Sequence, residues 1–153
     1  MPFATDDPIY AEQSPKVTFP VLALSIALFA SSLCNFCFCT QTACRTSIEA
    51  LLLGWCGIPE GGASIAWLAN PLLAIAWVLL ARNKKAAWIL ALAASLLCLS
   101  FLKSQVVIDN EAGLSSPILK IRIGYWLWLS SSMTTFLGSL IIKLFRYFKT
   151  HNS

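Results

Sequence analysis

Residues 63–102 read ASIAWLANPLLAIAWVLLARNKKAAWILALAASLLCLSFL, and this stretch decides the fold class. It contains two uncharged apolar segments, 63–81 and 86–102, which are joined by the four residues Arg82-Asn-Lys-Lys85. An α-helix rises about 1.5 Å per residue, so each segment can cross or nearly cross a hydrocarbon core about 30 Å thick. The stretch therefore predicts two neighbouring transmembrane helices with a tight, basic turn between them.

Two further apolar stretches bring the number of such segments to four. Residues 17–39 and 124–142 also carry no charge, and all eleven Lys and Arg and all seven Asp and Glu residues lie outside the four stretches. Hydrocarbon demands this segregation, because a charge at the bilayer centre costs a few kcal/mol or more. We expect an all-α integral membrane protein: a four-helix transmembrane domain over 17–145, a mobile N-terminal tail at 1–16 and a basic C-terminal tail at 146–153.

The basic residues predict which end of the bundle faces the cytoplasm. The turn at 82–85 holds three basic and no acidic residues, and so does the segment 143–149. With four spans these segments and the N-terminus share one side, and short cytoplasmic segments are enriched in Lys and Arg. The sequence predicts a multi-pass membrane protein with both termini in the cytoplasm; the resemblance given below implies the bacterial inner membrane. The longer connections, 40–62 and 103–123, would then lie outside.

Each outer connection carries its own structural signal. Thr46-Ser-Ile-Glu49 fits a capping box before an apolar run that ends at Trp55, which predicts a short helix lying at the membrane interface. The segments 106–108 and 118–123 are β-branched or alternating and enclose turn residues, which predicts a small β-hairpin. These surfaces are the expected contacts with a protein partner, through the candidate residues Glu49, Trp55, Lys120 and Arg122.

The spans contain polar and small residues that need a packing partner. Asn70-Pro71 predicts a kink in the second span, and Asn70 serves either as a ligand or ion contact or as an interhelical hydrogen bond. Small residues also recur every four positions, which either packs the bundle internally or forms a homo-oligomer seam. The three sets are Ala23, Ala27 and Ser31; Ala87, Ala91 and Ser95; and Ser131, Thr135 and Ser139.

The cysteines gather near the expected outer side, where disulfides persist. Cys34 and Cys37 have the spacing of a redox motif, and Cys44 and Cys56 bracket the expected interfacial helix. The spacing resembles that of quinone-coupled disulfide-forming enzymes and vitamin K epoxide reductases, but their second cysteine pair has no counterpart in 103–123. The six cysteines allow fifteen complete pairings, and the sequence does not select one. The redox or disulfide candidates are Cys34, Cys37, Cys39, Cys44 and Cys56.

Three phrases of the chain look like those of uncharacterised small polytopic membrane proteins of bacteria. The resemblance covers residues 48–129 and implies a compartment and a fold but no activity. The phrases are IEALLLGW at 48–55, WLANPL at 67–72 and GYWLWL at 124–129.

Function follows mainly by elimination. The only histidine is His151, so neither a histidine metal site nor a Ser–His pair can be assembled, and no cofactor, metal or nucleic-acid site is expected. We favour a non-catalytic membrane protein that binds another protein, such as an immunity protein against a membrane-active toxin or an accessory subunit of a membrane complex. The alternatives are a thiol–disulfide redox enzyme that uses Cys34 and Cys37, and a small transporter or oligomeric pore.

Overall fold

The computed structural model describes residues 8–108 and 115–151 and is mostly helical. Within these residues it contains five α-helices, two 3₁₀ helices and two small antiparallel sheets. The α-helices are α1 (Pro8–Leu33), α2 (Ser47–Leu53), α3 (Ala69–Ala81), α4 (Ala87–Phe101) and α5 (Ile123–His151). The 3₁₀ helices are η1 (Gly54–Glu60) and η2 (Gly62–Leu68), and the strands are β1 (Phe36–Cys39), β2 (Cys44–Thr46), β3 (Val106–Ile108), β4 (Ser115–Pro117) and β5 (Lys120–Ile121).

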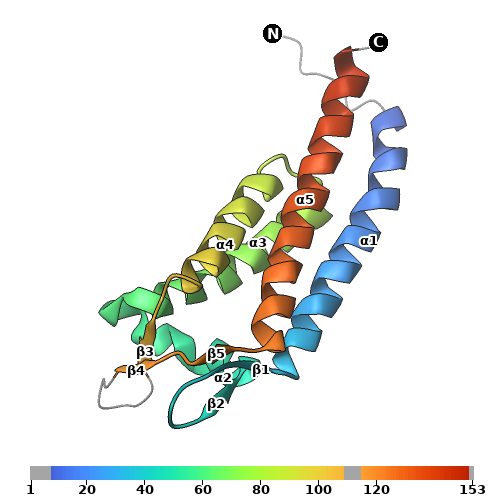
Figure 1. Cartoon of the computed structure of the whole chain (residues 1–153). Coiled ribbons are helices and arrows are strands. Elements are labelled where there is room, and N and C mark those ends of the chain that lie inside the picture. The colour runs from blue at the N-terminus through green and yellow to red at the C-terminus, as the bar shows by residue number, and fades with distance from the viewer. Residues whose placement is uncertain (1–7, 109–114, 152–153) are drawn as a thin grey trace.

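Four helices form an elongated bundle, and the remaining elements gather at one of its ends. Helices α1, α3, α4 and α5 lie side by side, with α5 packed against both α1 and α4 (Figure 1). The first turns of α1, the last turns of α5 and the α3–α4 turn point toward one end, while α2 and the strands lie at the other. We call the described residues of 35–68 and 104–122 the cap.

Two of the helical segments are long and apolar enough to cross a membrane. Gly62–Ala81 is 20 residues long and Ile123–Phe145 is 23 residues long, and an 18-residue stretch within each has a mean hydropathy of 1.9 and 1.3 respectively. The apolar helices Val17–Leu33 and Ala87–Phe101 are shorter. Two of the four expected spans are therefore long and apolar enough to cross a membrane. The other two are shorter than the sequence predicts.

The first expected span is shortened at its C-terminal end. Helix α1 stops at Leu33 rather than continuing to Cys39, because residues 36–39 form β1 and pair antiparallel with both β2 and β5. The alternating sequence Phe36-Cys-Phe-Cys39 suits a strand as well as an apolar helix, and its backbone finds partners in the cap. At the other end, α1 already begins at Pro8 and so includes part of the tail expected at 1–16; residues 1–7 lie outside the described part of the chain.

The kink expected at Pro71 is replaced by a change of helix type. The segment 62–68 is the 3₁₀ helix η2, and α3 begins only at Ala69. Pro71 therefore lies in the first turn of an α-helix, where its missing N–H group leaves no intrahelical hydrogen bond unmade. The second apolar stretch does change from a 3₁₀ helix to an α-helix, but the change lies before Pro71 rather than at it.

The helix predicted in the first connection is confirmed, together with its capping box. The backbone N–H of Glu49 donates to Oγ1 of Thr46 at 3.3 Å, and the backbone N–H of Thr46 donates to Oε2 of Glu49 at 3.0 Å. Satisfying these two amide groups fixes the start of α2.

A hairpin also forms in the second connection, with a different second arm from the one predicted. Strand β3 pairs antiparallel with β4, whereas the residues predicted as the second arm contribute β5, which pairs with β1. Two backbone hydrogen bonds of 2.9 Å extend this pairing, from Leu119 to the carbonyl of Cys39 and from Arg122 to the carbonyl of Cys37. These residues pair instead with β1, a segment that the sequence predicts as the end of a helix. The turn residues 109–114 lie outside the described part.

Small polar residues connect α1, α3 and α5 inside the bundle. The Ser25 hydroxyl lies 2.7 Å from that of Thr135 and 3.0 Å from that of Ser131, and the Trp77 indole donates to Ser25 at 2.9 Å. The small residues of α4 and α5 named above are buried, so they pack within the bundle rather than on its surface. The set on α1 differs, because Ala23, Ala27 and Ser31 are exposed.

Candidate ligand-binding site

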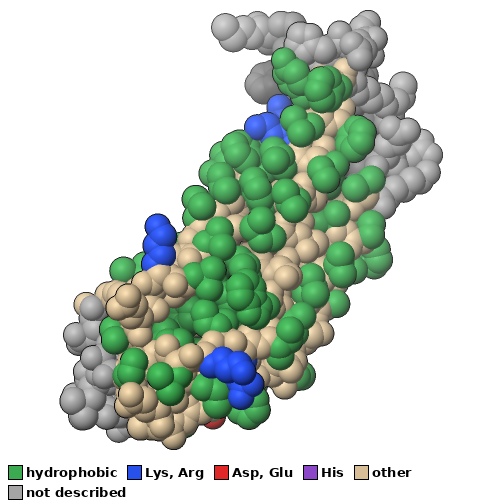
Figure 2. Space-filling model, in the orientation of Figure 1, with side chains coloured by type: hydrophobic (Ala, Val, Ile, Leu, Met, Phe, Trp, Pro, Cys, Tyr) green, Lys and Arg blue, Asp and Glu red, His purple; other side chains and the backbone are tan. Residues whose placement is uncertain are grey.

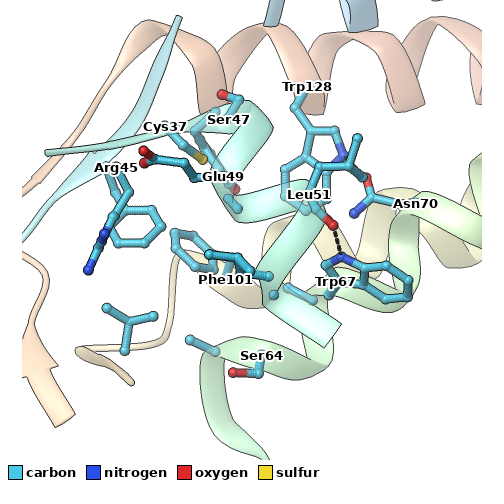
Figure 3. Close-up of a pocket in the computed structure, with 18 of the residues that line it drawn as sticks. Cys37, Arg45, Ser47, Glu49, Leu51, Ser64, Trp67, Asn70, Phe101 and Trp128 are labelled. Carbon is cyan, nitrogen blue, oxygen red and sulfur yellow. Dashed lines mark hydrogen bonds between the residues drawn. The ribbon is translucent and has the colours of Figure 1, made fainter. Parts of the chain in front are cut away.

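A cavity of about 690 Å³ lies where the cap meets the bundle. Its walls come from the C-terminal end of α1, from β1, α2, η1 and η2, and from the ends of α3, α4 and α5 that face the cap (Figure 3). Pockets that bind small molecules usually measure about 300–1,000 Å³ and are mostly apolar with a few polar groups. The large apolar residues that line the cavity are Phe29, Leu33, Phe38, Leu51, Leu53, Trp67, Phe101, Val107, Tyr125 and Trp128.

Stacked aromatic rings form one wall of the cavity. Phe101 lies between Phe38 and Tyr125, with ring centroids 5.7 Å and 5.5 Å apart respectively. Tyr125 is fully buried, and its hydroxyl donates to the carbonyl of Cys98 at 2.9 Å. Rings that pack on one another and carry a bonded hydroxyl have little freedom to collapse into the space beside them. This wall is therefore held open by its own packing.

Trp67 holds the opposite wall in place. Its indole N–H donates to the carbonyl of Leu51 at 2.7 Å, which joins η2 to the last turn of α2. A Cβ atom at Gly54 would lie 2.6 Å from Cδ1 of Trp67, so the indole needs a glycine at that position. The bond and the close contact together fix the distance between α2 and η2, and so the width of the cavity.

Asn70 presents a hydrogen-bond donor at the cavity wall. The indole N–H of Trp128 donates to Oδ1 of Asn70 at 2.8 Å, which joins α5 to α3. An indole can only donate, so this bond determines which end of the amide is the oxygen. The Nδ2 group of Asn70 makes no hydrogen bond to any described residue. Of the two roles expected for Asn70, the interhelical bond is present, and it leaves a donor for a ligand.

Ser47 is the most unusual polar residue near the cavity. Its side chain is 94% buried, and its Oγ has no hydrogen-bond partner in the described part of the chain. A Cβ atom at Gly124 would overlap this oxygen, so a glycine is required where the N-terminus of α5 passes α2. The hydroxyl lies beside the Cys37 thiol and lowers the pKa of that thiol, so the two buried groups interact at the cap–bundle junction.

The thiol of Cys37 is buried in the cavity wall and is not activated. Burial raises the pKa of the Cys37 thiol to about 11, and the neighbouring Ser47 hydroxyl offsets only part of that rise. A thiolate is the nucleophile in disulfide exchange, so this shift disfavours reactivity. Cys34 is exposed at the end of α1, and both cysteines are free thiols. The structure does not join the pair that had redox-motif spacing.

A disulfide joins Cys39 to Cys44 instead. The two residues face each other across the β1–β2 hairpin, whose loop is closed by a 2.9 Å bond from Thr40 N–H to the Ala43 carbonyl. The Nε–H group of Arg122 donates to Sγ of Cys39 at 3.4 Å, which ties β5 to the hairpin. Cys56 also lines the cavity as a free, exposed thiol and does not pair with Cys44.

The four candidate partner-binding residues lie in different parts of the cap. Glu49 lines the cavity, as does its neighbour Arg45 (Figure 3). Trp55 is exposed on η1, and its indole N–H donates to the carbonyl of Leu52 at 2.8 Å. Lys120 and Arg122 are exposed on or beside β5. These residues do not form one site, and only Glu49 belongs to the cavity.

The sequence reading missed the aromatic and hydroxyl residues that make the cavity. Trp67 and Trp128 were not among the candidate site residues, and Ser47 appeared only within the capping-box motif. Asn70 was the one signal that pointed to this place, because it is the only amide in the middle of an expected span. No cluster of metal-binding side chains occurs among the described residues.

Comparison of the chain with protein-family models, with curated proteins and with solved structures gives no match.

Proposed function

We propose that this chain is a non-catalytic integral membrane protein that binds a hydrophobic membrane-soluble molecule in the cavity beneath its cap. The single observation that carries the proposal is the cavity of about 690 Å³, walled by stacked aromatic rings at the cap–bundle junction. The cavity is partly open at the surface, so a hydrophobic ligand can enter it and make packing contacts with the apolar side chains that line it.

The proposal includes four membrane spans, formed by α1, η2–α3, α4 and α5. Large apolar side chains cover the outward faces of all four helices, and Figure 2 shows them extending along the bundle with few charged side chains between them. A soluble protein seldom exposes a continuous apolar surface of this extent, whereas lipid accommodates it. Examples from each helix are Leu24 and Ile26, Ile75 and Val78, Ile89 and Leu96, and Leu137 and Ile141.

The proposed orientation places the cap outside the cytoplasm. The basic turn at 82–85 and the basic end of α5 lie away from the cap, which supports a cytoplasmic location for that end under the positive-inside rule. Lys143 lies 3.9 Å from the ring centre of Trp88, an arrangement suited to the membrane boundary. The disulfide of Cys39 and Cys44 then belongs to the oxidising side, where disulfides persist.

We also propose that the exposed surface of the cap contacts a protein partner. Exposed apolar residues of the cap favour contact with a membrane-associated surface: Leu52 on α2, Trp55 on η1 and Leu119 beside β5. The role as an immunity protein or accessory subunit, expected from the sequence, stays a prediction.

Occupancy of the cavity can be tested with one pair of variants. Ala50 lines the cavity and is partly buried, so Ala50→Trp fills the space; Ala27 is exposed on α1, so Ala27→Trp adds the same side chain elsewhere. We expect wild type and Ala27→Trp to co-purify with a membrane-derived molecule close to one per chain, measured by native mass spectrometry. Ala50→Trp should lose it. Equal retention by the two variants would overturn the proposal.

A further inference from the structure

We propose that the bound molecule carries a carbonyl group on a hydrocarbon chain, as in an acyl lipid, and that this carbonyl accepts a hydrogen bond from Nδ2 of Asn70. This inference rests on the proposed function, because it names the chemistry of the molecule in the same cavity. It derives from the bond between Asn70 and Trp128 and from the place of the cavity along the bundle.

The first step is the polarity that Asn70 offers. Trp128 donates to Oδ1 at 2.8 Å, so the amide cannot be rotated to present its oxygen to the cavity without losing that bond. What remains is an NH₂ group with no bond to a described residue. A ligand that satisfies it must supply an acceptor. Such a site rejects analogues that lack the acceptor, because the donor is then left unpaired.

The second step is the apolar surroundings of that donor. The nearby walls are aromatic: Trp67, Trp128 and the stack of Phe101 on Tyr125. A freely charged acceptor would be poorly solvated among these rings, whereas a neutral carbonyl would not. The remainder of the ligand must be apolar to fill the space. Together these requirements describe a hydrocarbon chain with a neutral acceptor along it.

The third step concerns the position of Asn70 along the proposed membrane span. Asn70 follows η2 and opens α3, within a segment long and apolar enough to span a membrane, on the side of the bundle that carries the cap. Asn70 is the ninth of the 20 residues of the proposed span Gly62–Ala81, so its amide lies within the hydrocarbon part of the bilayer. An acyl lipid that satisfies it must bring its carbonyl into the cavity, and its chain then fills the apolar space there.

The test compares lipids that differ only in the carbonyl. Full-length protein in detergent is offered an equimolar mixture of a diacyl phosphatidylcholine and its dialkyl ether analogue with equal chain lengths, and retained lipid is measured by native mass spectrometry. We expect wild type to prefer the ester lipid about fivefold, which is the size of one net hydrogen bond. Asn70→Asp, which keeps an acceptor for Trp128, and Asn70→Leu should both lose the preference. Trp126→Phe, on the exposed side of the same helix, leaves the bond between Trp128 and Asn70 in place and should retain it.

The outcomes separate the two proposals. Equal retention of ester and ether lipids by wild type, or an unchanged preference in both Asn70 variants, would overturn the carbonyl contact while leaving cavity binding intact. No retained lipid of either kind would overturn the proposed function and this inference with it. A third arm with methyl palmitate identifies the source of the carbonyl: displacement of the diacyl lipid by this neutral ester supports the contact and assigns it to a single-chain acyl ester.

Discussion

Trp128 and Asn70 join α5 to α3 by a hydrogen bond of 2.8 Å from the indole nitrogen to the amide oxygen, and both side chains line the cavity. The bond has two consequences. It holds together two helices in the wall of the cavity, and it fixes the direction of the amide so that only its donor remains for a ligand. One contact therefore serves both the bundle and the proposed site.

Removing the Trp128 donor should weaken the bundle moderately. Trp128→Phe keeps an aromatic ring and deletes the N–H group, leaving the Asn70 oxygen without its partner. We expect a loss of about 1 kcal/mol in the free energy of unfolding, the usual size of one hydrogen bond. Thermal unfolding in detergent measures it, with Trp126→Phe on the exposed side of the same helix as control. Equal effects of the two substitutions would contradict the role given to the bond.

The capping box at the start of α2 should contribute a similar amount locally. Thr46→Ala removes the oxygen that accepts from the Glu49 amide, and such losses cost about 1 kcal/mol. Because α2 forms part of the cavity wall, we also expect weaker ligand retention. Hydrogen exchange of the α2 amides reports the loosening directly. Exchange in α2 that is no faster than in wild type would show that the packing of α2, rather than its cap, holds it.

The close approach of α1 and α5 depends on Gly138. A Cβ atom there would collide with both methyl groups of Val21. Although alanine is the better helix former by about 1 kcal/mol, we expect Gly138→Ala to destabilise the protein by about 1–3 kcal/mol through overpacking. Adding Val21→Ala should restore most of the loss. A double variant no more stable than Gly138→Ala alone would contradict this packing.

The cysteines make a prediction about thiol counts. With one disulfide between Cys39 and Cys44, the denatured but unreduced protein should titrate four free thiols, at Cys34, Cys37, Cys56 and Cys98. Peptide mapping without reduction should recover a linked fragment that contains Cys39 and Cys44. A link between Cys34 and Cys37 would instead restore the redox interpretation of the sequence.

The reactivity of Cys37 should depend on pH in a defined direction. Burial raises the pKa of the Cys37 thiol to about 11, so the folded protein holds this proton more tightly than the unfolded chain does. Its contribution to stability is complete at neutral pH and is lost as the pH rises from about 9 toward 11. Near pH 8 an alkylating reagent should modify the exposed Cys34 and spare Cys37. Equal rates at the two sites would contradict the burial.

Local signals in the sequence predicted where the main helices lie and where the capping box begins α2. Thr46 and Glu49 are three residues apart in the chain, so their reciprocal bonds require no tertiary information, and α2 was expected where it forms. The β-pairing was harder because it is non-local. Residues 36–39 are apolar and adjoin a helix, and nothing in their own composition shows that 120–121 will pair with them across more than 80 positions.

The cavity was harder still to predict from the sequence, because its walls come from residues far apart in the chain. Asn70 could be singled out because an amide within an apolar stretch is conspicuous, but its partner Trp128 lies 58 residues away. Tryptophan is common at membrane interfaces, and nothing in the sequence shows that Trp67 and Trp128 line the same cavity. Gly54 and Gly124 carry no local signal of their role either, because each makes room for a side chain from another element of the fold.

The membrane arrangement can be checked by single-cysteine labelling. In a variant with the native cysteines replaced, an impermeant maleimide added to intact cells should label a cysteine at Leu119 in the cap but not one at Asn83 in the α3–α4 turn. After membrane disruption both should react. The reverse pattern in intact cells would invert the proposed orientation, and labelling of both would contradict a membrane-embedded bundle with ends on opposite sides.

The most direct measurement of the central claim locates the bound molecule by photo-crosslinking. A phospholipid with a photoreactive group within one acyl chain is supplied to membranes that contain the protein, and adducts are mapped by mass spectrometry. We predict adducts at residues of the cavity wall such as Leu51, Trp67 and Phe101, which disappear in Ala50→Trp and persist in Ala27→Trp. Adducts confined to the lipid-facing residues Ile75, Val78 and Leu96, unchanged in Ala50→Trp, would show that the cavity holds no membrane molecule.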